Sequence, residues 1–292
     1  MTTTCAAPRS ERDFATILEA PDRLFIGGAW VSPQYGIRRQ LISPGSGRPF
    51  MTVAEAGTED VDCAVAAARE AFDKGPWPHM TPTERAAYFG RLAKEIVARA
   101  EALGGLQAAE MGIVYQLAVH LAPVFAGAFD WYANLASTFP FIEPHAPAVG
   151  GVGYLVHEPV GVVAAIVPWN GPLMLACWKL APALLAGCTV ILKASPEAPT
   201  TLIALAEAVQ AAGLPAGVFN FITADREVSE SLVRHPGVDK VSFTGSTAAG
   251  RTERLQVRFH DRLRRVQALG HRSGRWGSGP TLLPGAEDGL AR

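Results

Sequence analysis

The sequence predicts an α/β fold in which a parallel sheet is flanked by helices. Between Val160 and Thr244, short β-branched runs alternate with Ala/Leu-rich helical stretches through short loops. This rhythm is typical of βαβ units. The chain has 292 residues, of which 49% are hydrophobic and 18% charged, so it can bury a sizeable core.

The first half is predicted to be mainly helical. A strand, a Gly-Gly turn and a second strand occupy residues 24–30, and an apolar face at helical spacing predicts a helix over 59–72. A second helix is predicted to begin at Thr81, because Thr81 and Glu84 have the spacing of a capping box, and to end at Gly104-Gly105. A third helical region covers 107–139.

The second half supplies the predicted sheet. Its apolar, β-branched runs predict strands at 160–167, 189–192, 218–223 and 238–244. The intervening segments predict helices at 173–185, 200–212 and 227–234. In such sheets ligands bind at the carboxyl ends of the strands.

Composition excludes several classes of function. The net charge is −1 and the pI about 6.7, so the whole chain has no reason to bind nucleic acid or an anionic membrane. No segment approaches the ~20 apolar residues of a spanning helix, and the first residues lack a secretory signal, which favours a cytoplasmic protein. The four cysteines have no metal-ligand spacing, so no metal site is predicted.

Three polar segments follow predicted strands. Asn170 could donate to an oxyanion, Lys193 with Ser195 could contact ribose or phosphate, and Ser246 after Gly245 could open a phosphate-binding helix. Taken singly, each has a more ordinary reading, as a turn, a solvated lysine or a helix cap. Together they lie at the ends of three strands of one sheet.

These segments belong to a longer series of motifs. The series is EPVGVV (158–163), PWN (168–170), WKLAPAL (178–184), AGCTVILK (186–193), AGLPAGVFN (212–220) and FTGS (243–246). In order and spacing it resembles the aldehyde dehydrogenase superfamily over roughly residues 22–252. The resemblance implies a Rossmann-like sheet with flanking helices, as part of an incomplete aldehyde dehydrogenase fold.

The resemblance also implies roles. This family oxidises aldehydes to carboxylic acids with NAD or NADP, using a nucleophilic cysteine and a glutamate base. Asn170 corresponds to the oxyanion-hole side chain, and Lys179 to a lysine that supports the active centre. The implied cofactor-binding residues are Ile166, Pro168, Trp169, Lys193, Ser195, Gly245, Ser246 and Gly250.

Two departures qualify those roles. Pro196 stands where many NAD-preferring members carry a glutamate, which leaves NAD versus NADP open. The family's Glu-Leu-Gly-Gly-Lys and Gly-Gln-x-Cys segments are absent, and none of the four cysteines replaces the nucleophile. We therefore expect a C-terminally truncated or frameshifted chain that is inactive as an aldehyde dehydrogenase. The alternative is a non-catalytic dinucleotide-binding or assembly module that pairs with an intact paralogue.

The expected organisation has four parts. Residues 1–21 form an N-terminal segment, 22–153 a helical part with the start of an oligomerisation strand, and 154–251 the Rossmann-like core. The tail, 252–292, has eight Arg and no Lys. A basic helix that contacts nucleic acid or membrane is one interpretation, but unrelated sequence from a shifted frame is favoured. Without the family's fifth strand, we expect an unpaired sheet edge, compromised homo- or hetero-oligomerisation and weak dinucleotide binding.

Overall fold

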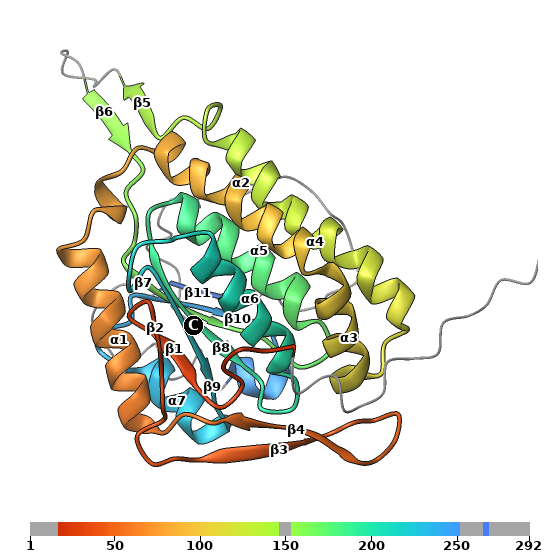
Figure 1. Cartoon of the computed structure of the whole chain (residues 1–292). Helices are drawn as coiled ribbons and strands as arrows, with labels where there is room; N and C mark the ends of the chain where they lie inside the picture. Colours follow the sequence, from red (N-terminus) through yellow and green to blue (C-terminus); the bar gives the residue numbers. More distant parts are fainter. Residues whose placement is uncertain (1–16, 146–152, 252–264, 269–292) are drawn as a thin grey trace, which may run out of the picture.

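A seven-stranded sheet runs through the centre of the molecule. The computed structural model describes residues 17–145, 153–251 and the backbone of 265–268. The strand order is β11-β10-β7-β8-β9-β1-β2 (Figure 1). These strands are β1 (Leu24–Ile26), β2 (Ala29–Val31), β7 (Val162–Ile166), β8 (Thr189–Ala194), β9 (Phe219–Thr223), β10 (Lys240–Phe243) and β11 (Arg265–Ala268).

Helices cover both faces of this sheet (Figure 1). The described helices are α1 (Thr58–Asp73), the 3₁₀ turn η2 (Trp77–His79), α2 (Pro82–Ala98), α3 (Ala100–Met111), α4 (Tyr115–Leu135), α5 (Pro172–Leu185), α6 (Thr200–Ala211) and α7 (Arg226–Arg234). A short helical turn also occupies 247–251. Two hairpins, β3 (Arg38–Ile42) with β4 (Pro49–Ala54) and β5 (Ile142–His145) with β6 (Gly153–Val156), stand apart from the central sheet.

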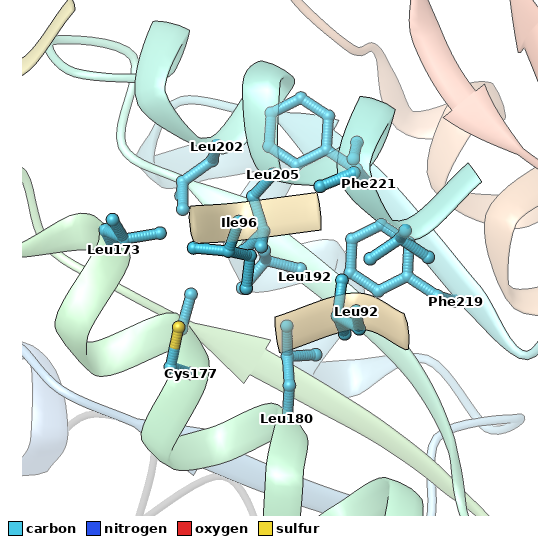
Figure 2. Close-up of a cluster of buried hydrophobic side chains, with 14 of the residues drawn as sticks. Leu92, Ile96, Leu173, Cys177, Leu180, Leu192, Leu202, Leu205, Phe219 and Phe221 are labelled. Atoms are coloured by element: carbon cyan, nitrogen blue, oxygen red, sulfur yellow. The ribbon is translucent and has the colours of Figure 1, made fainter. Parts of the chain in front are cut away.

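Alternate residues of β7, β8 and β9 pack into two separate cores. Val190 and Leu192 of β8 pack into a cluster with α2, α3, α4, α5 and α6, whereas Ile191 faces a second cluster with α1 and α7. Figure 2 shows part of the first cluster, where Leu192 lies among side chains of α2, α5 and α6. Burial on both faces explains why the strands read as continuous apolar runs.

The predicted parallel core is confirmed. β7 pairs in parallel with β8 and β10, and β8 with β9. All four predicted strands are present, and so is the first hairpin. That hairpin joins the sheet through β1, which pairs antiparallel with β9, so the sheet is mixed rather than wholly parallel.

The expectation of an unpaired edge beside β10 is wrong. β11 pairs there in parallel, with Val241 opposite Val266. The strand is only four residues long and lies in an Arg-rich stretch, so it carries no periodic signal of its own. The helix considered for residues 255–266 lies largely outside the described residues, as do 269–292.

The Gly104-Gly105 pair does not end a helix. α2 ends earlier, at Ala98, and α3 passes through both glycines. A Cβ at Gly104 would collide with Val119 of α4, so the glycine permits two helices to approach closely. The helical region predicted from 107 breaks instead at Gly112, whose φ of 74° is left-handed. The capping box of Thr81 and Glu84 is confirmed.

No described helix is both long enough and apolar enough to cross a membrane.

Candidate functional site

The three polar segments meet at one edge of the sheet. Ile166, at the end of β7, lies opposite Lys193 of β8 and opposite Phe243 of β10. Backbone hydrogen bonds continue past the strands. Val167 N donates to Lys193 O over 3.2 Å, and Thr244 N donates to Ile166 O over 3.1 Å. The loops that follow these strands therefore start side by side.

The strand order reverses at this position. From β7 the chain proceeds to β8 and β9 on one side and then returns to β10 on the other (Figure 1). Loops after β7 and β10 therefore diverge to opposite faces of the sheet. In open α/β sheets, ligands bind in the crevice that such a reversal creates.

The loop after β7 is open to solvent. Trp169 is 54% exposed and Asn170 is also exposed, although Ile166 just before them is buried. The loop enters α5 through Gly171, which provides no side-chain cap. The first backbone N–H groups of α5 consequently lack a side-chain acceptor on this residue.

The loop after β10 forms a tight turn on an aromatic ring. Gly245 lies against Phe243 so closely that a Cβ would overlap the ring, and Gly250 lies over the same ring. Ser246 Oγ accepts a hydrogen bond from Ala249 N over 3.2 Å, so its predicted capping role is confirmed. Thr244 Oγ1 is buried and has no hydrogen-bond partner within the described residues.

Lys193 and Ser195 lie on the neighbouring strand end. Lys193 is buried in the sheet edge, and the Ser195 hydroxyl donates to the Glu197 carboxylate.

Arg39 of β3, which the sequence analysis did not identify, makes a bidentate pair with Glu55, at 2.8 and 3.0 Å. The hydrogen bond that Arg39 donates to the Glu55 carboxylate is the main cause that raises the pKa of Arg39, and the charge of Glu197 adds to it. No sequence motif indicates that Arg39 lies near Glu197, because the β3–β4 hairpin and Glu197 are far apart in the sequence.

Lys179 lies deeper than the other candidates. It is buried on α5, and its Nζ donates to Ser242 Oγ of β10 over 2.9 Å. It therefore ties α5 to the strand that precedes the Gly245 turn.

Cys177 and Cys188 are poor nucleophiles. Cys177 and Cys188 are buried, and desolvation raises the pKa of Cys177 to about 12 and also raises that of Cys188. Cys63 is exposed on α1, and Cys5 lies outside the described residues. Within the described part of the chain, no group of three or more His, Cys, Asp or Glu side chains could hold a metal ion.

A mixed sheet with a parallel core and a strand-order reversal, and with a glycine turn and helix starts at that reversal, is typical of nucleotide-binding α/β proteins. The sequence model of the aldehyde dehydrogenase family matches residues 30–269. The chain belongs to the aldehyde dehydrogenase family. The match continues past residue 252, to which the resemblance in the sequence analysis extends, and it includes β11.

Individual relatives agree with this assignment. The chain is 38% identical over 229 residues to geranial dehydrogenase of Castellaniella defragrans, which covers 78% of this chain and 48% of the relative. It is also 38% identical over 243 residues to an NADP/NAD-dependent aldehyde dehydrogenase of Escherichia coli, covering 82% and 49% respectively. The chain thus spans about half the length of these curated relatives.

Solved structures show the same fold. Betaine aldehyde dehydrogenase of Staphylococcus aureus in complex with NAD⁺ superposes with a TM-score of 0.83 at 30% identity, covering 88% of this chain and 51% of that one. An apo indole-3-acetaldehyde dehydrogenase gives 0.82 at 36% identity, covering 87% and 60%. Both the family and its cofactor class, NAD or NADP, follow from these relationships.

Proposed function

We propose that this chain binds NAD or NADP at the carboxyl edge of β7, β8 and β10. The observation that carries the proposal is the direct adjacency of Ile166, Lys193 and Phe243 at the point where strand order reverses. Pro168 and Trp169 would line the nicotinamide side, and Lys193 with Ser195 would contact the adenosine ribose. Gly245, Ser246 and Gly250 would lie against the pyrophosphate.

The residues present fit such a ligand. The glycine turn after β10 removes side-chain bulk, and the buried Thr244 hydroxyl beside it has no hydrogen-bond partner among the described residues. When bound, the nicotinamide supplies the hydride acceptor for aldehyde oxidation. Asn170 would donate its amide N–H to a developing oxyanion, and Lys179 would support the site through Ser242.

We further propose that residues 1–292 alone do not oxidise aldehydes. Burial raises the pKa values of the Cys177 and Cys188 thiols, so both are protonated at neutral pH. The Glu-Leu-Gly-Gly-Lys segment, which carries the family's glutamate base, is absent from the sequence. Buried, unpaired thiols also favour a reducing, cytoplasmic setting.

Ligand-detected NMR with NAD⁺ and NADP⁺ up to millimolar concentration tests the binding proposal. We expect saturable signals for at least one dinucleotide that Gly245→Val abolishes. An assay of NADH or NADPH formation with an aliphatic and an aromatic aldehyde tests the second proposal, and no turnover is expected. Absence of binding would refute the first proposal, and Cys-dependent turnover would refute the second.

The same titrations address cofactor choice. Pro196 removes a carboxylate that would repel a 2′-phosphate, whereas Glu197 keeps one nearby. We propose that both dinucleotides are accepted. A preference of more than about a hundredfold for either, which corresponds to roughly 3 kcal/mol, would contradict this.

An assembly module is the second candidate function. The β5–β6 hairpin extends from the body (Figure 1) and exposes Ile142, Tyr154 and Leu155, the last at 54%. Such apolar side chains favour contact with another subunit, either a second copy or an intact paralogue. Light scattering should detect an oligomer that Leu155→Glu dissociates, and a monomeric chain at micromolar concentration would count against this candidate.

A further inference from the structure

A buried carboxylate clamps the helix that follows the Lys193 strand. Glu110, on the last turn of α3, is 7% exposed. It accepts hydrogen bonds from Thr200 N over 2.7 Å and from Thr201 N over 3.2 Å. Both threonine hydroxyls also donate to it. Every oxygen of this side chain is therefore directed at the first turn of α6.

This contact replaces a local cap that α6 lacks. The N-cap residue of α6 is Pro199, which has no side chain able to accept from the helix. Thr200 and Thr201 are fully buried, so water cannot satisfy their N–H groups. A carboxylate from another helix fills the role that Ser, Asp or Asn normally has at this position.

A short loop connects the helix start that Glu110 holds to the strand end of the proposed cofactor site. Only residues 195–199 separate β8, which ends at Ala194, from Thr200. The loop is held on the strand side by the pairing of Ala194 with Thr223, and internally by Ala198 N donating to Ser195 O over 3.2 Å. A shift of the α6 start would consequently move Ser195 and Pro196.

We infer that Glu110 is a positioning residue for dinucleotide binding, which acts by fixing the loop 195–199 through the first turn of α6. The inference rests on the proposed function for its ligand. Both side-chain oxygens of Glu110 accept from Thr200 and Thr201, so its effect passes through these two residues.

Glu207 provides a matched control on the same helix. It is also a buried glutamate, 8% exposed, and it accepts a backbone hydrogen bond from Glu19 N over 2.7 Å. Burial raises its pKa as it raises that of Glu110. It differs in facing the N-terminal segment instead of the loop after β8.

The test compares Glu110→Gln with Glu207→Gln in the full chain. Glutamine at 110 retains one acceptor and turns an NH₂ group toward the α6 amides. Hydrogen–deuterium exchange over 194–203 reports the loop directly, and NADH and NADPH titrations report affinity. We expect E110Q to accelerate exchange there and to weaken binding about three- to tenfold, because the competent loop is populated less. E207Q should change neither by more than about twofold, even at a similar loss of melting temperature.

Each outcome decides the inference. Equal effects of the two variants, or unaltered exchange in E110Q, would overturn it. If the unsubstituted chain binds no dinucleotide, the proposed function fails, and the exchange comparison still decides whether Glu110 fixes the loop. If E110Q does not fold, Thr201→Val, which removes one hydroxyl donor to Glu110, is measured in the same way.

Discussion

The interiors of the central strands are buried, whereas the loops at their carboxyl ends are exposed. Every residue of β7 and β8 is buried, yet Asn170 and Trp169, only a few positions beyond β7, are exposed. Inside the sheet, close packing requires side chains of matching size and shape. At the strand ends, backbone N–H groups and polar side chains are left accessible. Substitutions inside the sheet should therefore mainly lower stability, and substitutions at the strand ends should mainly lower dinucleotide binding.

Thiol chemistry should show the largest contrast. Desolvation raises the pKa of Cys177 from an ordinary 9.0 to about 12, which lowers its thiolate fraction about a thousandfold. Iodoacetamide followed by peptide mass spectrometry should modify exposed Cys63 and leave Cys177 unmodified in the folded chain. In urea both should react. Rapid native modification of Cys177 would place it outside the core.

Truncating a core side chain should give the next largest effect. Leu192→Ala removes a fully buried side chain from β8 and should lower the free energy of unfolding by about 3 kcal/mol. Trp169→Ala, at the strand end, should cost less than about 1 kcal/mol. Urea unfolding midpoints provide the measurement. Equal losses would show that the β7 loop also supports the fold.

A methyl group in the glycine turn should affect binding more than stability. Gly245→Ala pushes on the Phe243 ring and should weaken dinucleotide binding at least tenfold, with a stability loss of about 1 kcal/mol. Gly127→Ala in α4 is the control, because nothing lies within 4 Å of the added Cβ. Titration and thermal unfolding of both variants test this. Unchanged affinity in Gly245→Ala would remove the turn from the site.

The pH dependence of stability should be the smallest effect. Burial raises the pKa of Glu110 above its ordinary 4.5, so the protonated form is favoured more in the folded chain than in the unfolded chain. That stabilisation is complete below 4.5 and is lost as pH rises through the folded pKa. Between pH 4 and 8, the melting temperature should fall more steeply with rising pH for the unsubstituted chain than for Glu110→Gln. An opposite slope would mean that the four hydrogen bonds outweigh desolvation.

The same contrast explains what could be predicted from the sequence. Strand interiors and helix faces carry periodic signals, so β7 to β10 and their helices were found within a few residues. The juxtaposition of Asn170, Lys193 and Gly245 followed from the rule for parallel strand ends. The assigned roles of these residues, and the division of the chain at 153 and 251, stay predictions.

Other features depend on contacts between segments far apart in sequence. In the sequence, Gly104-Gly105 indicates the end of a helix. Only the close approach of α4 shows that Gly104 lies inside α3 and permits the two helices to pack. Nothing local connects Glu110 with Thr200, or Arg39 with the edge near Glu197. The pairing of β11 with β10 was missed because four residues in a charged stretch are too few for a pattern.

The antiparallel pairing of β1 with β9 sets an order of events during synthesis. Phe25 pairs with Phe221, so the N-terminal hairpin has no sheet to join until nearly two hundred further residues have been made. At ~5–20 residues per second, that delay is roughly 10–40 s. During this interval the apolar strand Leu24–Ile26 has none of its native neighbours in β9. The pairing of β1 with the central sheet therefore cannot form until β9 has been synthesised.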